Sequence, residues 1–345
     1  MPDVLVTGGS GFFGGLLKRQ LLADGFAVTN IDLVPDPDRN PALTSIQGDL
    51  RNPACLAGVF AGHRFDAVFH CAAVLAHGRI TDREIWSANV DGTRLLAETC
   101  RVAGVPKFIF ISTNCLWAHN LGRPVREDDA PAPVETYGRS KLAAEQLLAG
   151  YSQAMEITIL RSPTIISSGR LGLLAILFEF IHENRTVWVV GSGANRYQFI
   201  YAPDLVQACL AAFRSSAPDT FHVGSDRVQS LRDVYEAVIR TAGSRSRVRS
   251  LPKSPALSAL HAAHALRISP LGPYHYKMIA EDFLFDTTRI KERLGWRPTF
   301  SNAEMLTEAY RYYAERRQEI EARTDVSAHS RPAEMGIVRL VKWLS

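Results

Sequence analysis

The chain has few cysteines, little net charge and no long apolar run, and each shortage excludes a class of protein. Its 345 residues include five cysteines, an odd number at wide spacing without a C-x-x-C pattern. That usage argues against a disulfide framework or a zinc knuckle and favours a reducing compartment. The longest apolar stretch, residues 171–181, is interrupted by Glu179 and falls short of the ~20 residues that span a bilayer.

The charges nearly balance. Lysine and arginine number 39 and aspartate and glutamate 35, so the net charge of +4 gives no reason to expect a nucleic-acid partner. Hydrophobic residues make up 46% and charged residues 21%, which is typical of a globular chain that buries a full core. Because a glycine-rich motif is entered by Thr7, we expect no signal peptide and a cytoplasmic location.

Apolar strands alternate with helical patterns through the first half of the chain. We expect strands at residues 4–6, 27–31, 67–70, 108–111 and 157–160, and helices after residue 14 and at 90–103 and 140–151. Parallel neighbours need a crossover, usually a helix, so this alternation predicts a doubly wound parallel α/β sheet.

The regular alternation of strands and helices ends after Ser162. Helices are expected at residues 171–181, 204–213, 231–241, 252–267, 287–294 and 302–315, with strands at 186–190 and 220–223. The sequence therefore predicts two units: residues 1–165 with a return segment at about 198–225, and a smaller α/β unit of residues 166–197 and 226–325. A tail of residues 326–345 reads as amphipathic.

A glycine-rich turn follows the first strand. Gly8, Gly11 and Gly14 form G-x-x-G-x-x-G at the head of a helix, where glycines let the backbone approach a pyrophosphate. Asp32 ends the next strand, where a carboxylate can bind an adenosine ribose 2′-hydroxyl and repel a 2′-phosphate. The pair predicts a Rossmann NAD site. The plainer alternatives are a flexible turn and, for Asp32, a turn residue before Pro35.

Tyr137 and Lys141 form a Y-x-x-x-K pattern. On a helix these positions share a face, and an ammonium beside a phenol lowers the pKa of that phenol. Tyr137 is thus a candidate acid/base with Lys141 as its partner. Alone the pattern more often marks a solvated helix face, but here it follows a dinucleotide-binding half.

Several motifs together resemble a known family. They are Thr7-Gly-Gly-Ser-Gly-Phe-Phe-Gly14, His70-Cys-Ala-Ala73, Asn89-Val-Asp-Gly-Thr93, Ser112-Thr113, Tyr137-x-x-x-Lys141, Gly191-x-Gly193 with Arg196, Phe199-Ile-Tyr201 with Asp204, Phe285-Asp286 and Leu294-Gly-Trp-Arg-Pro298. From residue 4 to about 313 the chain resembles extended short-chain dehydrogenases/reductases. Within them it resembles the NAD-dependent epimerase/dehydratase family, and nucleotide-sugar 4-epimerases in particular.

The resemblance implies roles for individual residues. Asp49 would meet the adenine amino group, Ala72 and Ala73 would line the cofactor path, and Arg196 would contact a substrate diphosphate, its alternative being a surface salt bridge. The implied catalytic residues are Thr113, Tyr137 and Lys141. The implied cofactor-binding residues are Gly8, Gly11, Phe12, Phe13, Gly14, Asp32, Asp49, Leu50, Ala72, Ala73, Asn89, Tyr137 and Lys141, and the substrate-binding residues Thr113, Thr164 and Arg196.

Some positions depart from the family pattern. The 4,6-dehydratases have an Asp-Glu pair directly after the threonine that matches Thr113, whereas this chain has Asn114 and Cys115, which argues against dehydration. Thr164 stands where the family often has an asparagine. No metal site is expected: His70, His77 and His119 lie on separate predicted elements, and His70 is expected to be structural.

The expected function is an NAD-dependent nucleotide-diphosphate-sugar epimerase that transiently oxidises a hydroxyl, at C4, with Tyr137 as base. Two alternatives stay open: a net oxidoreductase, such as a nucleotide-sugar reductase or hydroxysteroid dehydrogenase-like enzyme, and a non-catalytic NAD-binding regulator. The resemblance also suggests a homodimer. The amphipathic tail could lie on an anionic membrane surface, but docking on its own body or a second subunit is favoured.

Overall fold

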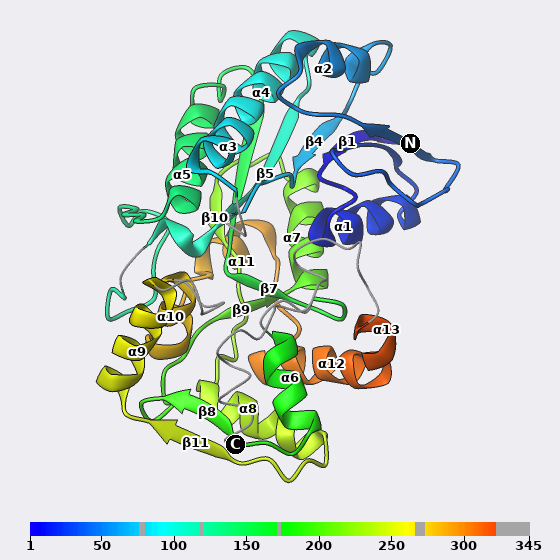
Figure 1. Ribbon diagram of the computed structural model, residues 1–345. Coiled ribbons are helices and arrows are strands. Elements are labelled where there is room, and N and C mark those ends of the chain that lie inside the picture. The colour runs from blue at the N-terminus through cyan, green and yellow to red at the C-terminus, as the bar shows by residue number, and fades with distance from the viewer. Residues whose placement is uncertain (76–79, 118–119, 171–173, 266–272, 322–345) are drawn as a thin grey trace.

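A seven-stranded parallel sheet dominates the molecule (Figure 1). We describe a computed structural model covering residues 1–75, 80–117, 120–170, 174–265 and 273–321. The strand order is β10-β6-β5-β4-β1-β2-β3, and every pairing is parallel. The strands are β1 (Asp3–Thr7), β2 (Ala27–Asp32), β3 (Leu43–Gln47), β4 (Ala67–His70), β5 (Lys107–Thr113), β6 (Glu156–Ser162) and β10 (Thr220–His222).

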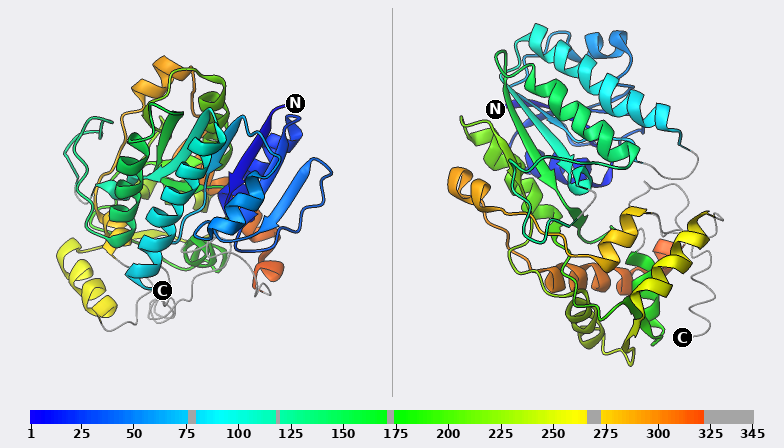
Figure 2. Two further views of the ribbon diagram at one scale, coloured as in Figure 1. Left: turned by 90° about the horizontal axis from the view of Figure 1, so that it is seen from above. Right: turned by 90° about the vertical axis from the view of Figure 1, so that its left-hand side faces the viewer.

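Helices cover both faces of this sheet (Figure 2). One face buries α1 (Phe12–Ala23), α7 (Ala202–Arg214) and part of α11 (Thr288–Leu294) in one hydrophobic core. The opposite face packs against α2 (Pro53–Phe60), α4 (Gly92–Ala103) and α5 (Thr136–Ala149), with α3 (Asp82–Trp86) and the π-turn η1 (Ser87–Asp91) leading into α4. The central strands are apolar throughout because both faces are covered. The expected doubly wound α/β fold is confirmed.

The order of the strands reverses between β1 and β4. From β1 the chain moves outward through β2 and β3, then crosses back to β4 and continues in the other direction. Ligands of open α/β sheets bind at the carboxyl ends of the strands beside such a switch point. The turns after β1 and β4 therefore mark the expected cofactor crevice.

A second group of elements lies below the sheet in Figure 1. It holds two small parallel sheets, β7 (Thr164–Ile166) with β9 (Phe199–Tyr201), and β8 (Val187–Val190) with β11 (Val248–Leu251). The helices are α6 (Leu174–His182), α8 (Leu231–Thr241), α9 (Lys253–Ala265), α10 (Pro273–Ala280), α12 (Asn302–Glu315) and α13 (Arg317–Glu321). They enclose a third hydrophobic core, to which Leu116, Trp117 and Val125 also contribute. We retain the predicted two-unit division as a proposal.

The sequence missed some elements and misplaced one boundary that matters. The strand β3 and the helix α2 were not expected, so β4 is the fourth strand of the chain and not the third. The signal of β3 was weak because it is an edge strand with exposed Thr44 and Ser45. The helix expected at 140–151 begins at Thr136, with Glu135 as N-cap, so Tyr137 lies within its first turn.

Of the helix expected at 171–181, the described residues form α6 from Leu174 onward, whose side chains Ala175, Phe178, Phe180 and Ile181 are buried. Phe178 packs against Tyr310 and Tyr313. Among the helices of the described residues, none combines the length and apolarity needed to cross a membrane. The predicted tail, residues 326–345, lies outside the described residues.

Candidate active site

The glycine-rich turn between β1 and α1 is tightly packed. Gly8 has a φ of +75°, and a Cβ there would lie 2.8 Å from the backbone of Ala72, on the turn after β4. A Cβ on Gly14 would collide with the carbonyl group of Gly8. Helix α1 begins after Gly11, and no side chain caps its N-terminus. The first backbone N–H groups of the helix are therefore available to a ligand. This cradle suits the pyrophosphate of a dinucleotide.

Phe13 is buried in the core beneath the turn, so only its backbone is available to a ligand. Phe12 is partly buried, and the guanidinium carbon of Arg170 lies 5.7 Å from its ring centroid. Arg170 follows β7 in the chain, so the second group of elements brings a cation against the glycine-rich turn. Nothing in its sequence context indicated this contact.

Two carboxylates were predicted to hold the adenosine half. Asp32 accepts hydrogen bonds from the backbone N–H groups of Ser10 (2.9 Å) and Val34 (3.1 Å), which places it beside the glycine-rich turn. Asp49 instead pairs with the Arg51 guanidinium at 2.6 Å, and this hydrogen bonding lowers the pKa of its carboxyl. Leu50 is partly buried against the core. Their predicted contacts with NAD stay predictions.

The turn after β4 is held by hydrogen bonds between distant segments. The buried His70 contacts the Thr7 hydroxyl through Nδ1 (2.6 Å) and the Thr93 hydroxyl through Nε2 (2.8 Å). Burial lowers the pKa of His70 to about 3, so it is neutral, in line with its expected structural role. Asn89 binds the backbone of Val74 through both polar atoms and the Ser140 hydroxyl through Nδ2. The side chain of Asn89 thus ties this turn, with Ala72 and Ala73, to helix α5.

The three predicted catalytic residues come from two neighbouring elements. Thr113 ends β5, and its hydroxyl accepts a 3.1 Å bond from the N–H of Cys115 in the short 3₁₀ turn η2 (Asn114–Leu116). Tyr137 and Lys141 lie on α5. A Cβ on Gly138 would lie well under 3.0 Å from the Cys115 carbonyl oxygen, so α5 can reach η2 only because residue 138 is glycine.

Lys141 points into the protein and not into solvent. Its side chain is buried, and Nζ lies 3.8 Å from the centroid of the Phe110 ring. Burial lowers the pKa of Lys141 to about 7, although the nearby Glu145 carboxylate opposes the shift. Lys141 therefore changes charge near neutral pH. The sequence pattern gave the position of this residue but not its burial.

A buried ion pair supports the same region and was missed by sequence reasoning. Glu145 on α5 pairs with Arg161 on β6 at 2.7 Å, and both side chains are less than 10% exposed. The Ser112 hydroxyl also donates to Glu145. Asn114 donates to the Tyr197 hydroxyl at 2.7 Å, which links the turn after Thr113 to the second group of elements. The only sequence signal was polar residues within buried segments.

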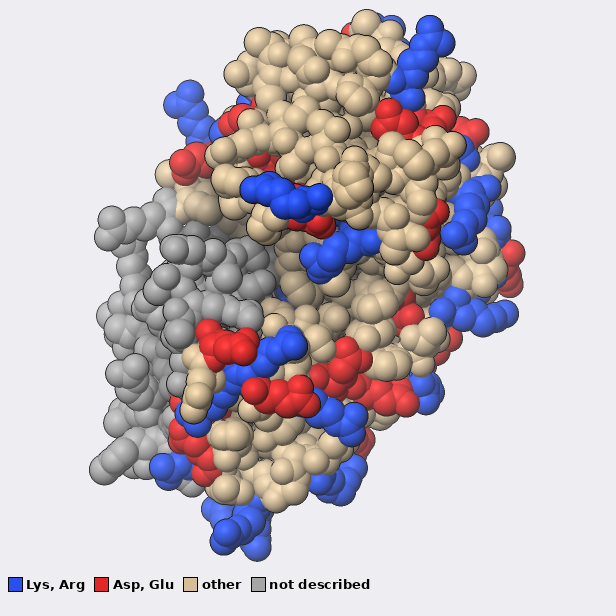
Figure 3. All heavy atoms as spheres, turned by 90° about the vertical axis from the view of Figure 1, so that its right-hand side faces the viewer, with Lys and Arg blue, Asp and Glu red and all other residues tan. Residues whose placement is uncertain are grey.

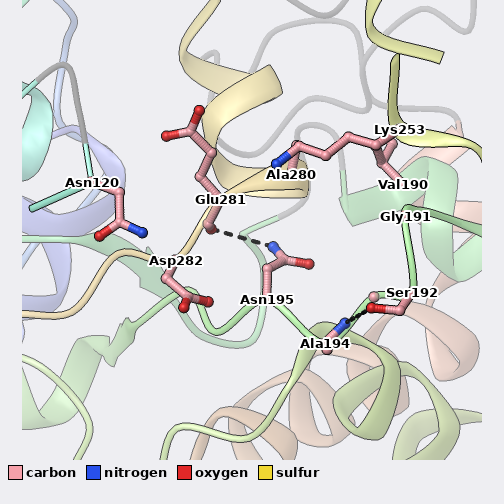
Figure 4. Close-up of a pocket in the computed structure, with 11 residues that line it drawn as sticks. Asn120, Val190, Gly191, Ser192, Ala194, Asn195, Lys253, Ala280, Glu281 and Asp282 are labelled. Atoms are coloured by element: carbon pink, nitrogen blue, oxygen red, sulfur yellow. Dashed lines mark hydrogen bonds between the residues drawn. The ribbon is translucent and has the colours of Figure 1, made fainter. Parts of the chain in front are cut away.

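A cavity of about 650 Å³ lies in the second group of elements (Figure 4). Its wall runs from the end of β8 through the following turn, the start of α9 and the end of α10. Polar and charged side chains predominate: Asn120, Ser192, Asn195, Lys253, Glu281 and Asp282. In Figure 4 Lys253 extends past Ala280 and Asn195 lies beside Glu281, whose carbonyl oxygen it contacts at 3.3 Å. No residue of this wall was predicted as a site residue.

The two remaining predicted substrate residues do not line this cavity, although Arg196 directly follows its wall residue Asn195 in the chain. Arg196 is exposed, and its backbone N–H donates to Asp282 at 2.5 Å. The next residue, Tyr197, is the one that points inward. Thr164 is partly buried at the start of β7, paired in register with Phe199. The predicted substrate contacts of Arg196 and Thr164 stay predictions.

Two other expectations concern metals and charge. His77 and His119 lie outside the described residues, and within the described ranges no three His, Cys, Asp or Glu side chains are grouped to hold a metal ion. On the face drawn in Figure 3, basic and acidic side chains are interspersed, as the small net charge suggested.

The comparisons with known proteins agree with this geometry. A model of the NAD dependent epimerase/dehydratase family matches residues 4–224. The chain is 26% identical to the UDP-glucose 4-epimerase of Mycolicibacterium smegmatis, over 91% of this chain and 99% of the relative. It is also 26% identical to the 3-beta-hydroxysteroid dehydrogenase of Mycolicibacterium neoaurum, over 90% of this chain and 91% of the relative.

Solved structures share the fold. The UDP-glucuronic acid 4-epimerase of Bacillus cereus, solved in complex with NAD, matches with a TM-score of 0.72 at 22% identity. The match covers 91% of this chain and 99% of that one. The similarity therefore includes the second group of elements as well as the parallel sheet.

Proposed function

The chain belongs to the NAD dependent epimerase/dehydratase family and is an NAD-dependent enzyme, and from this premise we propose that it epimerises a nucleotide-diphosphate sugar. The reaction centre we propose is C4 of the sugar. The similarity to a UDP-glucose 4-epimerase and to UDP-arabinose 4-epimerase 1 of Arabidopsis thaliana supports this choice.

The polar cavity is the observation that carries the proposal. A nucleotide diphosphate offers phosphate oxygens, hydroxyls and a base edge, and the wall of the 650 Å³ cavity offers hydroxyl, amide, ammonium and carboxylate groups. The apolar helix α6 packs most of its apolar side chains against the core, so its apolarity is no sign of an apolar substrate. The chemistry of the cavity therefore favours a polar substrate over a steroid.

The proposed roles follow from the positions of the residues. NAD, when bound at the glycine-rich turn, would supply the hydride acceptor and donor that transient oxidation of the sugar carbon requires. Tyr137 takes the proton of the sugar hydroxyl, and the Thr113 hydroxyl holds that oxygen and relays the proton. Lys141, when protonated, stabilises the Tyr137 phenolate and can donate to the cofactor ribose. Glu145 and Arg161 hold α5 against β5 and β6 and so fix this geometry.

A net NAD-dependent oxidoreductase is the second candidate. It is favoured by the similarity to a 3-beta-hydroxysteroid dehydrogenase over nine-tenths of the chain. The two functions share the first half-reaction and differ in whether the oxidised product leaves. A non-catalytic NAD-binding protein is a weaker candidate, because the sequence keeps Thr113, Tyr137 and Lys141 together.

The test is a screen of UDP-sugars with the purified protein, measuring both sugar isomerisation and NADH absorbance. Interconversion of 4-epimers without NADH accumulation supports the proposal. Stoichiometric NADH with an oxidised product would replace it with the oxidoreductase. Tyr137→Phe should lower turnover by about 100-fold or more, whereas Tyr151→Phe, just beyond the other end of α5, should not. Equal turnover in wild type and Tyr137→Phe would remove the catalytic assignment.

We also propose that the protein is a homodimer, as the family resemblance suggested. Light scattering of the purified chain measures its mass in solution. A monomer mass would contradict the proposed homodimer and would leave the proposed catalytic function unaffected.

A further inference from the structure

A second, smaller cavity lies on the outer side of the glycine-rich turn. Its volume is about 250 Å³. It is lined by Gly9, Ser10, Gly11, Gly15, Lys18, Arg19, Asp36, Pro37 and Asp38, which come from the turn, from α1 and from the loop after β2. Ser10 belongs to this wall and also donates its N–H to Asp32. The cavity is thus one residue away from the carboxylate expected to take the ribose 2′-hydroxyl.

Two opposite charges in this wall, Lys18 and Asp36, are paired and buried, whereas Arg19 is exposed. The Lys18 ammonium lies 2.5 Å from Asp36 and 3.7 Å from Asp38, and the Lys18 and Asp36 side chains are 3% and 1% exposed. Asn30, which is fully buried, donates to Asp36 at 2.8 Å and accepts from the N–H of Gly9 at 2.9 Å. Asp36 is therefore connected to the glycine-rich turn through one side chain.

We propose that Asp36 is a second determinant of cofactor choice, which keeps Lys18 neutralised so that the cavity beside Asp32 rejects the 2′-phosphate of NADP. The wall holds two cations, Lys18 and Arg19, and two anions, Asp36 and Asp38, and the carboxylate of Asp32 is adjacent. With Asp32 included, the charges around a phosphate ester in this cavity sum to a negative value, so the ester is repelled. Without the charge of Asp36, the Lys18 ammonium is free to bind phosphate oxygens.

The alternative is that the pair only staples α1 to the loop after β2. A structural role and a role in cofactor selectivity predict different NADP+ affinities for the variants, because Lys18 attracts a phosphate and Asp36 repels it. Loss of Asp36 exposes a cation to the phosphate, and loss of Lys18 exposes an anion. A purely structural pair would weaken NAD and NADP equally in both variants.

The experiment measures the ratio of the dissociation constants of NADP+ and NAD+ by titrating protein freed of bound nucleotide. Adenosine 2′,5′-bisphosphate and ADP serve as probes of the adenosine half. Asp36→Asn keeps the shape and should lower the NADP+/NAD+ ratio about tenfold or more, and Lys18→Met should raise it. In the double variant Asp36→Asn/Lys18→Met, the improvement in NADP+ binding caused by Asp36→Asn should disappear. Asp24→Asn, at the far end of α1, is the matched control and should leave the ratio unchanged.

The Asp32 carboxylate of the wild type is expected to repel the 2′-phosphate of NADP+. The same variants are therefore also compared in an Asp32→Ser background, where NADP+ binding is strong enough to measure. A ratio that is unchanged in Asp36→Asn in both backgrounds, in protein with an unaltered circular dichroism spectrum, overturns the proposal. If Asp36→Asn fails to fold, Lys18→Met decides: a raised ratio supports the proposal, and an unchanged ratio overturns it. These are binding measurements, so they do not depend on which sugar the enzyme epimerises.

Discussion

Gly138 and Cys115 approach so closely that a Cβ on residue 138 would lie well under 3.0 Å from the Cys115 carbonyl oxygen. The contact joins the first turn of α5, which carries Tyr137, to the turn that follows Thr113. A glycine inside a helix normally costs ~1 kcal/mol relative to alanine, and here it permits α5 and η2 to meet.

Gly138→Ala should therefore lower kcat although it raises helix propensity. The added methyl must push α5 away from η2, and displacement of a catalytic group by about 1 Å can cost about 100-fold. NAD affinity should change little, because the glycine-rich turn is untouched. The matched control is Gly58→Ala on α2, where a Cβ meets no atom within 4 Å. Wild-type kcat in Gly138→Ala would show that the separation of Tyr137 and Thr113 is not critical.

Lys141 should make the stability of the cofactor-free protein depend on pH. Burial lowers its pKa in the folded state from 10.5 to about 7. Between these values the unfolded chain binds the proton and the folded protein does not, so the cost of burying the charge is present in full below pH 7 and is relieved as the pH rises. Unfolding free energy should rise with pH across this window, by up to about 1.4 kcal/mol per unit.

Urea unfolding of wild type and Lys141→Met across that window isolates the contribution of this residue. The variant should lose the slope, whereas Lys107→Met, whose ammonium contacts carbonyl groups at the protein edge, should keep it. Parallel curves for wild type and Lys141→Met would mean that Lys141 titrates near its ordinary pKa.

Removal of only one partner of the buried Glu145–Arg161 pair should be strongly destabilising. Arg161→Met leaves the Glu145 carboxylate buried beside Ser112 without its counter-charge, and breaking a buried pair costs about 3–5 kcal/mol. The double variant Arg161→Met/Glu145→Leu should recover part of the loss, because no buried charge then remains. Urea denaturation measures all three proteins.

Glu98→Gln is the control, because Glu98 pairs with Arg101 at the exposed surface of α4 and its loss should have no measurable effect. If Arg161→Met unfolds no more readily than Glu98→Gln, the buried pair does not support α5 as inferred.

Lys253 should contribute to nucleotide binding in the 650 Å³ cavity. Its ammonium reaches the wall from the start of α9, and one lost charge-assisted hydrogen bond to phosphate corresponds to about a tenfold weaker affinity. Calorimetric titration with UDP should show this loss in Lys253→Met. Lys291→Met, which removes a surface pair with Asp226, should bind UDP like wild type. Equal affinities in all three would place the diphosphate elsewhere.

Much of the fold could be predicted from local pattern. The strands around Val4, Val68 and Phe108 are short apolar runs between helical periods, and each was found within a few residues of its place. Edge strand β3 was missed because an edge needs little apolar sequence, and the first turn of α5 was missed because Glu135 is an uncommon N-cap.

The site was only partly predictable. Gly8, Asp32 and Thr113 lie where their motifs suggested, since the chain on each side of them forms the expected strand and turn. After the G-x-G turn the Tyr197 side chain is buried and the Arg196 side chain is exposed, and the predicted substrate contact of Arg196 stays a prediction. Which of two adjacent residues points inward depends on packing against Asn114 and Asn302, which lie far away in the chain.

The sequence by itself determined the parallel α/β architecture and the glycine-rich turn, and it singled out Tyr137 and Lys141 as the proposed acid/base pair, because these features depend on residues within one or two turns of each other. Only the tertiary structure decided the charge environment of Lys141, the pairing of Lys18 with Asp36 and the polar character of the 650 Å³ cavity. The physical reason is that burial and ion pairing depend on groups brought together from distant segments, whose desolvation no local spacing records.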